Sequence, residues 1–319
     1  MLQRKRHLII LFILLSLTLA LVTTGAVQSG HQVRLFVNVF DAAGQQVEDL
    51  KKENFSVLED NVPQQLTSFS HERSLVSLSL VIDTSGSMKT KMRVATSTLT
   101  GLLGQLQAED EALLSQFKTE AELIEEYTTD RRRLIAALSG LYTSGGSAVF
   151  DAVLAHADYA RERAKHPQKA LVVITDGLEK NSSTSENDLL GALAETGVRV
   201  FFIVLLDEKG DKDLTFQKPK DFLRVKEKLS RIAAVAGGQA FFPQTVGDLT
   251  VAIERIESCL RTPYVLTYSS ANNLPDGKLR RMDVVVQTSD QRQLQALAPQ
   301  NWTLPKPAKG KQKKDKKKQ

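Results

Sequence analysis

Cysteine, histidine and the common catalytic motifs are scarce in this sequence. Cys259 is the only cysteine among 319 residues, so no disulfide can form within the chain, and its place on an apolar helical face predicts burial. The sequence contains neither the G-x-x-x-x-G-K-[S/T] loop that cradles phosphates nor the G-x-S-x-G turn that presents a nucleophilic serine. Three of the five histidines precede residue 75, and His156 and His166 are expected to be exposed, on or just after a helix. With no nucleophile and base paired, we expect no enzymatic activity.

A surplus of positive charge is also missing from the part of the chain that should fold. The formal net charge is +5, but residues 1–26 contribute +3, and residues 305–319, with eight lysines and one aspartate, contribute +7. The remaining residues, 27–304, therefore carry −5. Nucleic-acid binding requires basic side chains arrayed over a folded surface, so this distribution argues against a nucleic-acid partner.

The first 26 residues are predicted to be a secretory signal peptide. A basic start at Arg4–Arg6 precedes an apolar run over residues 8–22, and small residues suitable for cleavage follow at Thr24–Ala26. The alternative is an uncleaved membrane anchor, because residues 8–27 are just long enough to cross a bilayer. Either reading predicts an exported protein in the periplasm, at the cell surface or secreted.

The last residues, 305–319, form a lysine-rich segment of low complexity. Such a composition buries too little apolar surface to fold, so we expect disorder. The segment is either a solvated tail or an electrostatic contact to a membrane or another anionic envelope surface.

Two strand-rich segments, 27–73 and 263–304, flank the middle of the chain. Neither shows helical periodicity, and both contain short apolar runs separated by turn residues. We expect the two segments to pair with each other in one small sheet or sandwich built from both chain ends. The strands predicted here are 33–40, 55–60, 64–69, 264–270 and 280–288.

The region 74–262 is predicted to be an α/β domain with a doubly wound, mostly parallel sheet. Strand patterns alternate with helical patterns of period 3.6, and apolar runs such as 78–82 and 170–174 are typical of strands covered on both faces. The short link between 112–117 and 121–127 predicts an antiparallel hairpin at the edge. The other strands predicted are 75–83, 170–176, 198–206 and 239–244.

Oxygen-bearing side chains gather where these central strands end. Asp83, Ser85 and Ser87 follow the first strand on one tight turn, and Asp176 follows another strand. Ser147 opens a helix between them. Ligand sites of open α/β sheets lie at the carboxyl ends of the strands, and hard oxygen donors suit Mg²⁺, or Mn²⁺ or Ca²⁺, better than Zn²⁺. Taken singly, each residue is also explained as a helix cap or a turn.

These segments resemble the metal-ion-dependent adhesion site of von Willebrand factor type A domains. The resemblance covers roughly residues 75–262 in an order that fits a single domain. The flanking segments are similar to those around this domain in a group of exported bacterial proteins. The matching motifs are Asp83-Thr-Ser-Gly-Ser87, Gly146-Ser147-Ala-Val-Phe-Asp151 and Ile174-Thr-Asp176-Gly177.

The resemblance implies a ligand for each position of the site. Ser85, Ser87 and Ser147 would bind the ion directly, and Asp83 and Asp176 would bind it directly or through water. The family usually has threonine where Ser147 stands; serine is less stiff at χ1, so the affinity for metal is expected to be somewhat lower. The turn is expected at the surface, so Asp83→Ala should lose the metal and keep the fold.

Asp151 lies one helical turn after Ser147 and is predicted to face the same way. We assign it a hydrogen bond to a metal ligand. The alternative is an ordinary acid in the first turn of a helix, where the helix dipole favours it.

The charged insertion at residues 207–221 follows another strand and is expected on the metal-bearing edge. It is either a solvated loop or a loop that selects the partner, with Phe216 as an apolar anchor.

The function expected is that of an exported protein-binding module. It would engage a protein partner through the metal, with an aspartate or glutamate of the partner completing the coordination. The alternative is a non-catalytic envelope scaffold whose metal site is weak or lapsed. A phosphotransferase of the D-x-D type is excluded because Ser85 stands where the second acid is needed.

Overall fold

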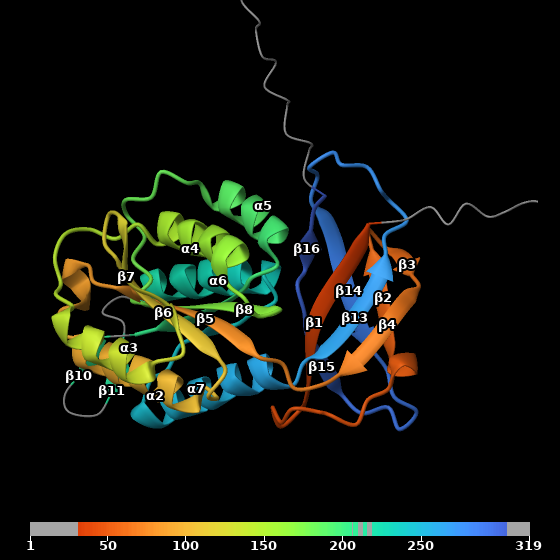
Figure 1. Cartoon of the computed structure of the whole chain (residues 1–319), viewed down its shortest axis with the longest axis horizontal. Coiled ribbons are helices and arrows are strands. Elements are labelled where there is room, and N and C mark those ends of the chain that lie inside the picture. Colours follow the sequence, from red (N-terminus) through yellow and green to blue (C-terminus); the bar gives the residue numbers. More distant parts are fainter. Residues whose placement is uncertain (1–30, 206, 210–212, 216–218, 305–319) are drawn as a thin grey trace, which may run out of the picture.

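The structure, a computed structural model, describes residues 31–205, 207–209, 213–215 and 219–304 (Figure 1). The predicted signal peptide and lysine-rich tail lie outside these residues. No helix within the described ranges combines the length and the hydrophobicity that crossing a membrane requires.

A six-stranded sheet forms the centre of the larger part of the molecule. All its strands are parallel except the edge strand β7, which pairs antiparallel with β6 as the hairpin prediction requires. Every residue of β5 and β9 is buried, which explains why apolar residues predominate in both strands. In spatial order the strands are β12 (Ala240–Phe241), β9 (Arg199–Val204), β8 (Gln168–Thr175), β5 (Val76–Asp83), β6 (Glu111–Phe117) and β7 (Ala121–Thr128).

Helices cover both faces of this sheet, so the predicted doubly wound α/β fold is confirmed (Figure 1). The side chains of Asp130, Ser185 and Thr245 cap the first turns of α3, α5 and α7. One face carries α4 (Val149–Arg163), α5 (Glu186–Thr196) and α6 (Pro219–Val235), and the other carries α2 (Met92–Gln105), α3 (Arg131–Ala137) and α7 (Val246–Arg261).

The two ends of the described chain form a β-sandwich of two antiparallel four-stranded sheets, as predicted. Asn61 adopts a left-handed conformation in the turn between β2 and β3, with φ of 65°. The short strands β15 and β16 were not predicted. One sheet contains β15 (Leu294–Leu297), β1 (Gln32–Asp41), β13 (Tyr264–Ser269) and β4 (Leu66–His71); the other contains β16 (Asn301–Trp302), β14 (Arg280–Val286), β2 (Phe55–Glu59) and β3 (Val62–Gln64).

A buried arginine ties the sandwich to the α/β part. Arg199 of β9 donates to the carbonyl oxygens of Gly237 at 2.8 Å and Cys259 at 2.7 Å, and to Asn38 Oδ1 of β1 at 2.9 Å. Burial lowers the pKa of this guanidinium, and the three acceptors compensate in part for its lost hydration. Cys259 is fully buried and reduced, as expected.

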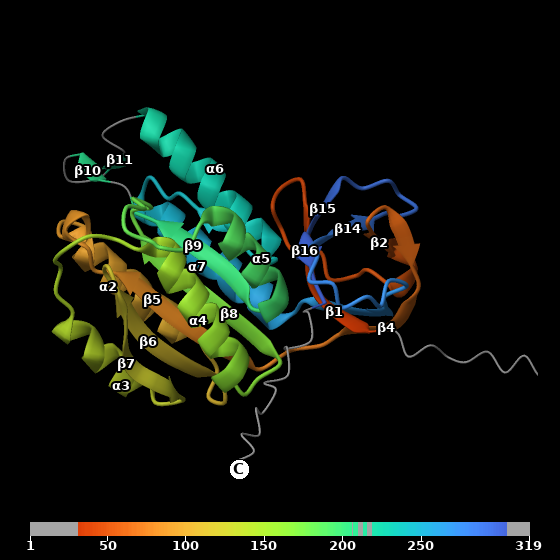
Figure 2. The same cartoon turned by 90° about the horizontal axis from the view of Figure 1, so that it is seen from above.

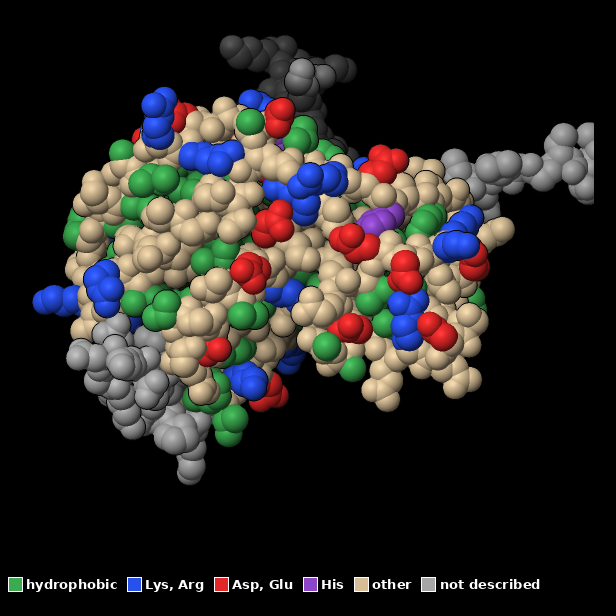
Figure 3. Space-filling view, turned by 90° about the horizontal axis from the view of Figure 1, so that it is seen from below, with side chains coloured by type: hydrophobic (Ala, Val, Ile, Leu, Met, Phe, Trp, Pro, Cys, Tyr) green, Lys and Arg blue, Asp and Glu red, His purple; other side chains and the backbone are tan. Residues whose placement is uncertain are grey.

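The carboxyl ends of the parallel strands point away from the sandwich. The chain passes from β4 directly into β5, so the amino end of β5 adjoins the sandwich (Figures 1 and 2). The insertion at 207–221 contains a small hairpin, β10 (Asp207–Lys209) with β11 (Asp213–Thr215), at the far end; Phe216 lies outside the described residues. On the face shown in Figure 3, charges of both signs are mixed and hydrophobic side chains are scattered.

A buried ion pair holds the amino end of the sheet. Asp110 accepts from Arg261 Nη2 at 2.8 Å and from the backbone N–H of Val76 at 2.9 Å. Burial raises the pKa of Asp110, but Arg261 and two backbone N–H groups lower it further, so the net pKa is below its usual value.

We predict that Asp110→Asn lowers the free energy of unfolding by about 3 kcal/mol at pH 7, because Arg261 loses a buried partner. Because the pKa of Asp110 is lower in the folded than in the unfolded protein, its carboxylate stabilises the fold at pH values above the unfolded pKa of about 4. This stabilisation is lost as the pH falls through the folded pKa. Urea unfolding at several acidic pH values should therefore show that the free energy of unfolding falls less steeply with decreasing pH in the variant than in the wild type. Asp290→Asn, which removes an exposed Asp–Arg pair, should leave the free energy of unfolding nearly unchanged, because solvent screens that pair. Equal effects of the two variants would contradict the prediction.

Candidate metal site

Asp83, the last residue of β5, is the centre of a hydrogen-bond network. Its Oδ1 accepts the backbone N–H of Ser85 at 2.8 Å. Its Oδ2 accepts the hydroxyls of Ser147 at 3.0 Å and Thr175 at 2.7 Å. The turn was expected at the surface; Gly86 and Ser87 are exposed, but Asp83 itself is buried, with a relative exposure of 0%. β5 is a central strand, so the loop containing Ser147 and the end of β8 cover its last side chain.

The two serines of the turn lie beside Asp83. The hydroxyls of Ser85 and Ser87 are 3.2 Å apart; Ser85 is buried and Ser87 is exposed. Backbone hydrogen bonds from Gly86 N to Gly145 O at 3.1 Å and from Ser144 N to Thr84 O at 2.9 Å fasten the neighbouring loop onto the turn. The structure therefore brings the predicted hydroxyls to one place.

Ser147 is braced from its other side by the segment after β8. The backbone N–H of Ser147 donates to Asn181 Oδ1 at 3.1 Å, and its carbonyl accepts from the backbone N–H groups of Lys180 and Asn181. The Glu179 carboxylate in turn accepts the backbone N–H groups of Asn181 and Ser182. This bracing fixes the Ser147 hydroxyl toward Asp83.

Asp176 takes part in a contact that the sequence motif did not reveal. Its Oδ2 lies 3.2 Å from the ammonium of Lys91, and both side chains are nearly inaccessible, at 3% and 4% exposure. Lys91 also donates to the backbone carbonyl of Ser87 at 3.1 Å. The signal for it was a lysine four residues after Ser87, one helical turn further along the chain.

Thr175 is a second residue that the sequence reasoning missed. Its hydroxyl donates to Asp83 and accepts the N–H of Gly177 at 2.9 Å. A threonine at the end of an otherwise apolar strand, directly before Asp176, was the available signal.

The electrostatics and the donors of the site fit a divalent cation. Burial raises the pKa of Asp83, hydrogen bonds from Ser85 and Thr175 oppose the rise, and the nearby Asp176 adds to it. An acid whose charged form is penalised in this way gains from a bound cation. In the described ranges no three His, Cys, Asp or Glu side chains are grouped for a metal, so hydroxyls would have to supply part of any coordination. Two carboxylates and three hydroxyls are ligands that suit Mg²⁺ or Mn²⁺.

Asp151 holds a loop near the site. Its carboxylate accepts the N–H and hydroxyl of Ser183 at 2.8 and 3.1 Å and the N–H of Thr184 at 2.8 Å. Burial raises its pKa, but these hydrogen bonds outweigh burial and lower it. Its predicted bond to a metal ligand stays a prediction.

His156 is buried, so the expectation of an exposed side chain is wrong. Its ring contacts the Ala152 carbonyl at 2.7 Å and the Ser115 hydroxyl at 2.6 Å, because this face of α4 packs on the sheet. Burial lowers its pKa. The serine is fully buried too, so this pair of a hydroxyl and a base has no access to a substrate. His166 is half-buried.

A small basic cavity lies beside the candidate site. It has a volume of about 150 Å³, and its charged lining residues are the basic Lys180, Arg224 and Lys228 and the acidic Glu179. Gly177, the residue directly after Asp176, also lines this cavity. Gly177 has φ of +77°, and a Cβ there would approach Val225 of α6 to 2.3 Å, so glycine is required for this close approach.

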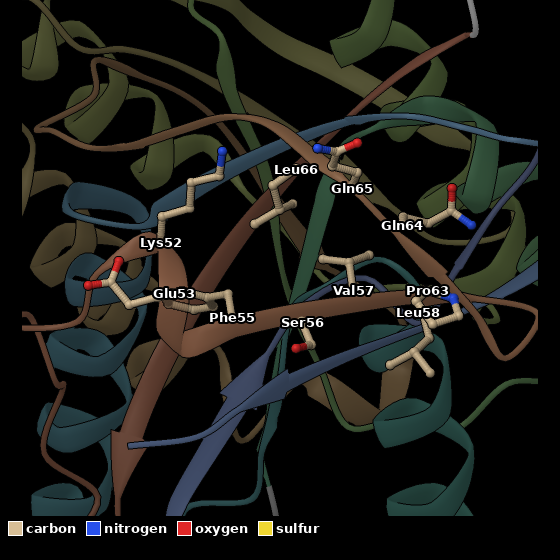
Figure 4. A pocket seen from close by; sticks show the side chains of 10 residues that line it. All are labelled: Lys52, Glu53, Phe55, Ser56, Val57, Leu58, Pro63, Gln64, Gln65 and Leu66. Atoms are coloured by element: carbon tan, nitrogen blue, oxygen red, sulfur yellow. The ribbon is translucent and has the colours of Figure 1, made fainter. Parts of the chain in front are cut away.

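A larger cavity of about 540 Å³ lies on the β-sandwich (Figure 4). β3 pairs only with Val57–Glu59 of β2, so Phe55 and Ser56 line an open groove together with Lys52, Glu53 and residues 63–66. It belongs to the other part of the molecule, at the opposite end from Asp83.

Comparison with known proteins identifies the domain. Residues 78–179 match the family model described as von Willebrand factor type A domain, so the chain carries such a domain. A domain of this type is a protein-interaction module, often a metal-dependent one. No curated protein matches the chain.

Solved structures with a similar arrangement share little sequence with this chain. The conserved hypothetical protein BatB of Bacteroides thetaiotaomicron is 16% identical, with 58% of this chain and 98% of that chain covered and a TM-score of 0.44. A von Willebrand factor type A protein of Catenulispora acidiphila is 13% identical, with 87% and 75% covered and a TM-score of 0.47. The manganese-loaded TRAP protein of Plasmodium vivax is 13% identical, with 75% and 98% covered and a TM-score of 0.44.

We predict that Asp83→Ala destabilises the metal-free protein by about 2–4 kcal/mol, since it leaves two buried hydroxyls and one N–H without their acceptor. Urea unfolding in the presence of a chelator measures this. Ser87→Ala, which removes an exposed hydroxyl from the same turn, should change stability by about 0.5 kcal/mol or less. If Asp83→Ala proved as stable as the wild type, the network would have no structural role.

Proposed function

We propose that this chain is a non-catalytic protein-binding module that engages its partner through a divalent cation. Asp83, Ser85, Ser87, Ser147 and Asp176 would hold the ion, which would be Mg²⁺, or Mn²⁺ or Ca²⁺. The observation that carries the proposal is the convergence of Ser147 and the serine turn on the buried carboxylate of Asp83. When bound, the ion would supply a positive charge and would coordinate an oxygen atom of the partner.

A partner that offers an aspartate or glutamate fits the surroundings of the site. Hydroxyl ligands are neutral, so they leave the ion more positive than a cage of carboxylates would. The adjacent cavity adds Lys180, Arg224 and Lys228, and the first two are exposed. An acidic segment would thus meet the metal and a basic surface together.

Each segment of the chain would have a separate role in this proposal. Residues 74–262 would bind the partner, while 27–73 and 263–304 would form a rigid support at the opposite end. We propose that residues 1–26 direct export or anchor the chain, which would place the protein in the periplasm, at the cell surface or outside the cell. The tail, 305–319, would contact an anionic membrane or envelope surface, and no nucleic-acid partner is proposed.

A scaffold with a lapsed metal site is the second candidate function. The buried Lys91 favours it, because an ammonium already neutralises Asp176 without any metal. An enzyme is not favoured, since Ser115 and His156 are buried together away from solvent.

Calorimetric titration of Mg²⁺ and Mn²⁺ into the protein separates the two. We predict saturable binding to the wild type and a loss of about tenfold or more in affinity for Ser147→Ala, which removes one ligand. Ser139→Ala removes an exposed hydroxyl far from the turn in sequence and should bind like the wild type. No binding heat in the wild type, together with no metal-induced rise in melting temperature, would favour the scaffold.

We further predict that the double variant Lys180→Glu/Arg224→Glu binds metal as the wild type does but retains less partner protein. The reason is repulsion between the reversed cavity and an acidic partner. The measurement is retention of proteins from a native extract in Mg²⁺, compared with release by chelator. Arg132→Glu, at an exposed position of α3, is the control and should retain the partner. Equal retention by both variants would remove the cavity from the interface.

A further inference from the structure

We propose that Lys91 is a built-in counter-cation of the metal site, and that it limits the affinity of the site for divalent ions. The proposal rests on the metal site named in the proposed function. It adds a residue outside the motif and a reason for the strength of binding.

Burial and geometry show that the ammonium of Lys91 is part of the site. Its side chain is 4% exposed, its Nζ lies 3.2 Å from Asp176 Oδ2, and it donates to the Ser87 carbonyl at 3.1 Å. It therefore bridges two of the predicted ligand segments, the serine turn and the end of β8. Lysine is almost never buried to this degree unless it is paired, so the contact with Asp176 is what permits its position.

The backbone holds Lys91 in this place. Its N–H donates to the Met88 carbonyl at 2.8 Å, and its carbonyl accepts the N–H of Ala95 at 2.9 Å as α2 begins. Met88 is fully buried in the core. The ammonium is thus carried by the turn that bears Ser85 and Ser87, so a change in that turn would move it.

The charges of the site lead to two consequences. The carboxylates of Asp83 and Asp176 and the ammonium of Lys91 sum to −1, whereas the two carboxylates alone would sum to −2. A divalent cation near this ammonium is repelled by it, and the repulsion is strong where water is excluded. The site without metal is therefore stabilised, and its affinity for metal is reduced.

The same charges favour an acidic partner. With a divalent cation bound, the site would carry a net charge of +1, whereas it would be neutral without Lys91. An incoming carboxylate would restore neutrality, so a bound partner would offset the repulsion between Lys91 and the ion. Metal and partner would then each increase the affinity for the other.

Removing the charge of Lys91 tests the inference. We expect Lys91→Met to bind Mn²⁺ about tenfold or more tightly than the wild type in calorimetric titration, and to melt at a lower temperature in chelator. Mn²⁺ should raise its melting temperature by more than it raises that of the wild type. Lys91→Gln, which retains a donor for the Ser87 carbonyl, should behave in the same direction if Lys91→Met folds poorly.

Lys89→Met is the matched control, because it removes the same charge from an exposed position two residues away in the same turn. It should change the affinity for Mn²⁺ by less than about threefold, owing to screening by solvent. Affinity of both Lys91 variants equal to or below that of the wild type would overturn the inference while leaving the proposed function intact. Binding by the Lys91 variants alone would support the inference and refute a metal-dependent function of the natural chain. No binding by any variant would overturn both.

Discussion

The buried carboxylate of Asp83 is the constraint on which the structure at the carboxyl ends of the central strands depends. A carboxylate at the end of a central strand is cut off from water, so its oxygens need donors from the protein. Ser85 N, the Ser147 hydroxyl and the Thr175 hydroxyl supply them, and they come from three separate segments. The requirement to satisfy one acid therefore assembles the serine turn, the Ser147 loop and the end of β8 into a single site.

In the proposed function, the site would balance the fixed positive charge of Lys91 against that of a bound metal ion. Lys91 already neutralises Asp176, while Asp83 has hydrogen bonds but a pKa that burial raises. The metal would thus compete with a residue of the chain, which is the physical difference between an adhesive module and a lapsed scaffold. Whichever cation prevails decides whether the site can attract a carboxylate.

The remainder of the fold leaves this edge accessible. The sandwich adjoins the amino ends of the strands, where Asp110 and Arg261 form their buried pair. Arg199 links the α/β part to the sandwich through Asn38. The carboxyl ends of the parallel strands point away from the sandwich (Figure 1). In the proposed function, a protein partner would approach the Asp83 edge without contacting the sandwich, which would serve as a support.

The sequence by itself determined the longer strands, the edge hairpin of 112–117 with 121–127, and the turn of Asp83, Ser85 and Ser87. It could do so because hydrophobic periodicity and turn chemistry are local properties of a few neighbouring residues. Only the tertiary structure decided the burial of Asp83, the inward position of His156, and the parts played by Thr175 and Lys91. Asp83 and Thr175 are 92 positions apart and Lys91 and Asp176 are 85 apart, so no local pattern records their contact. These contacts form when the folded sheet brings its strand ends together and excludes water from between the side chains.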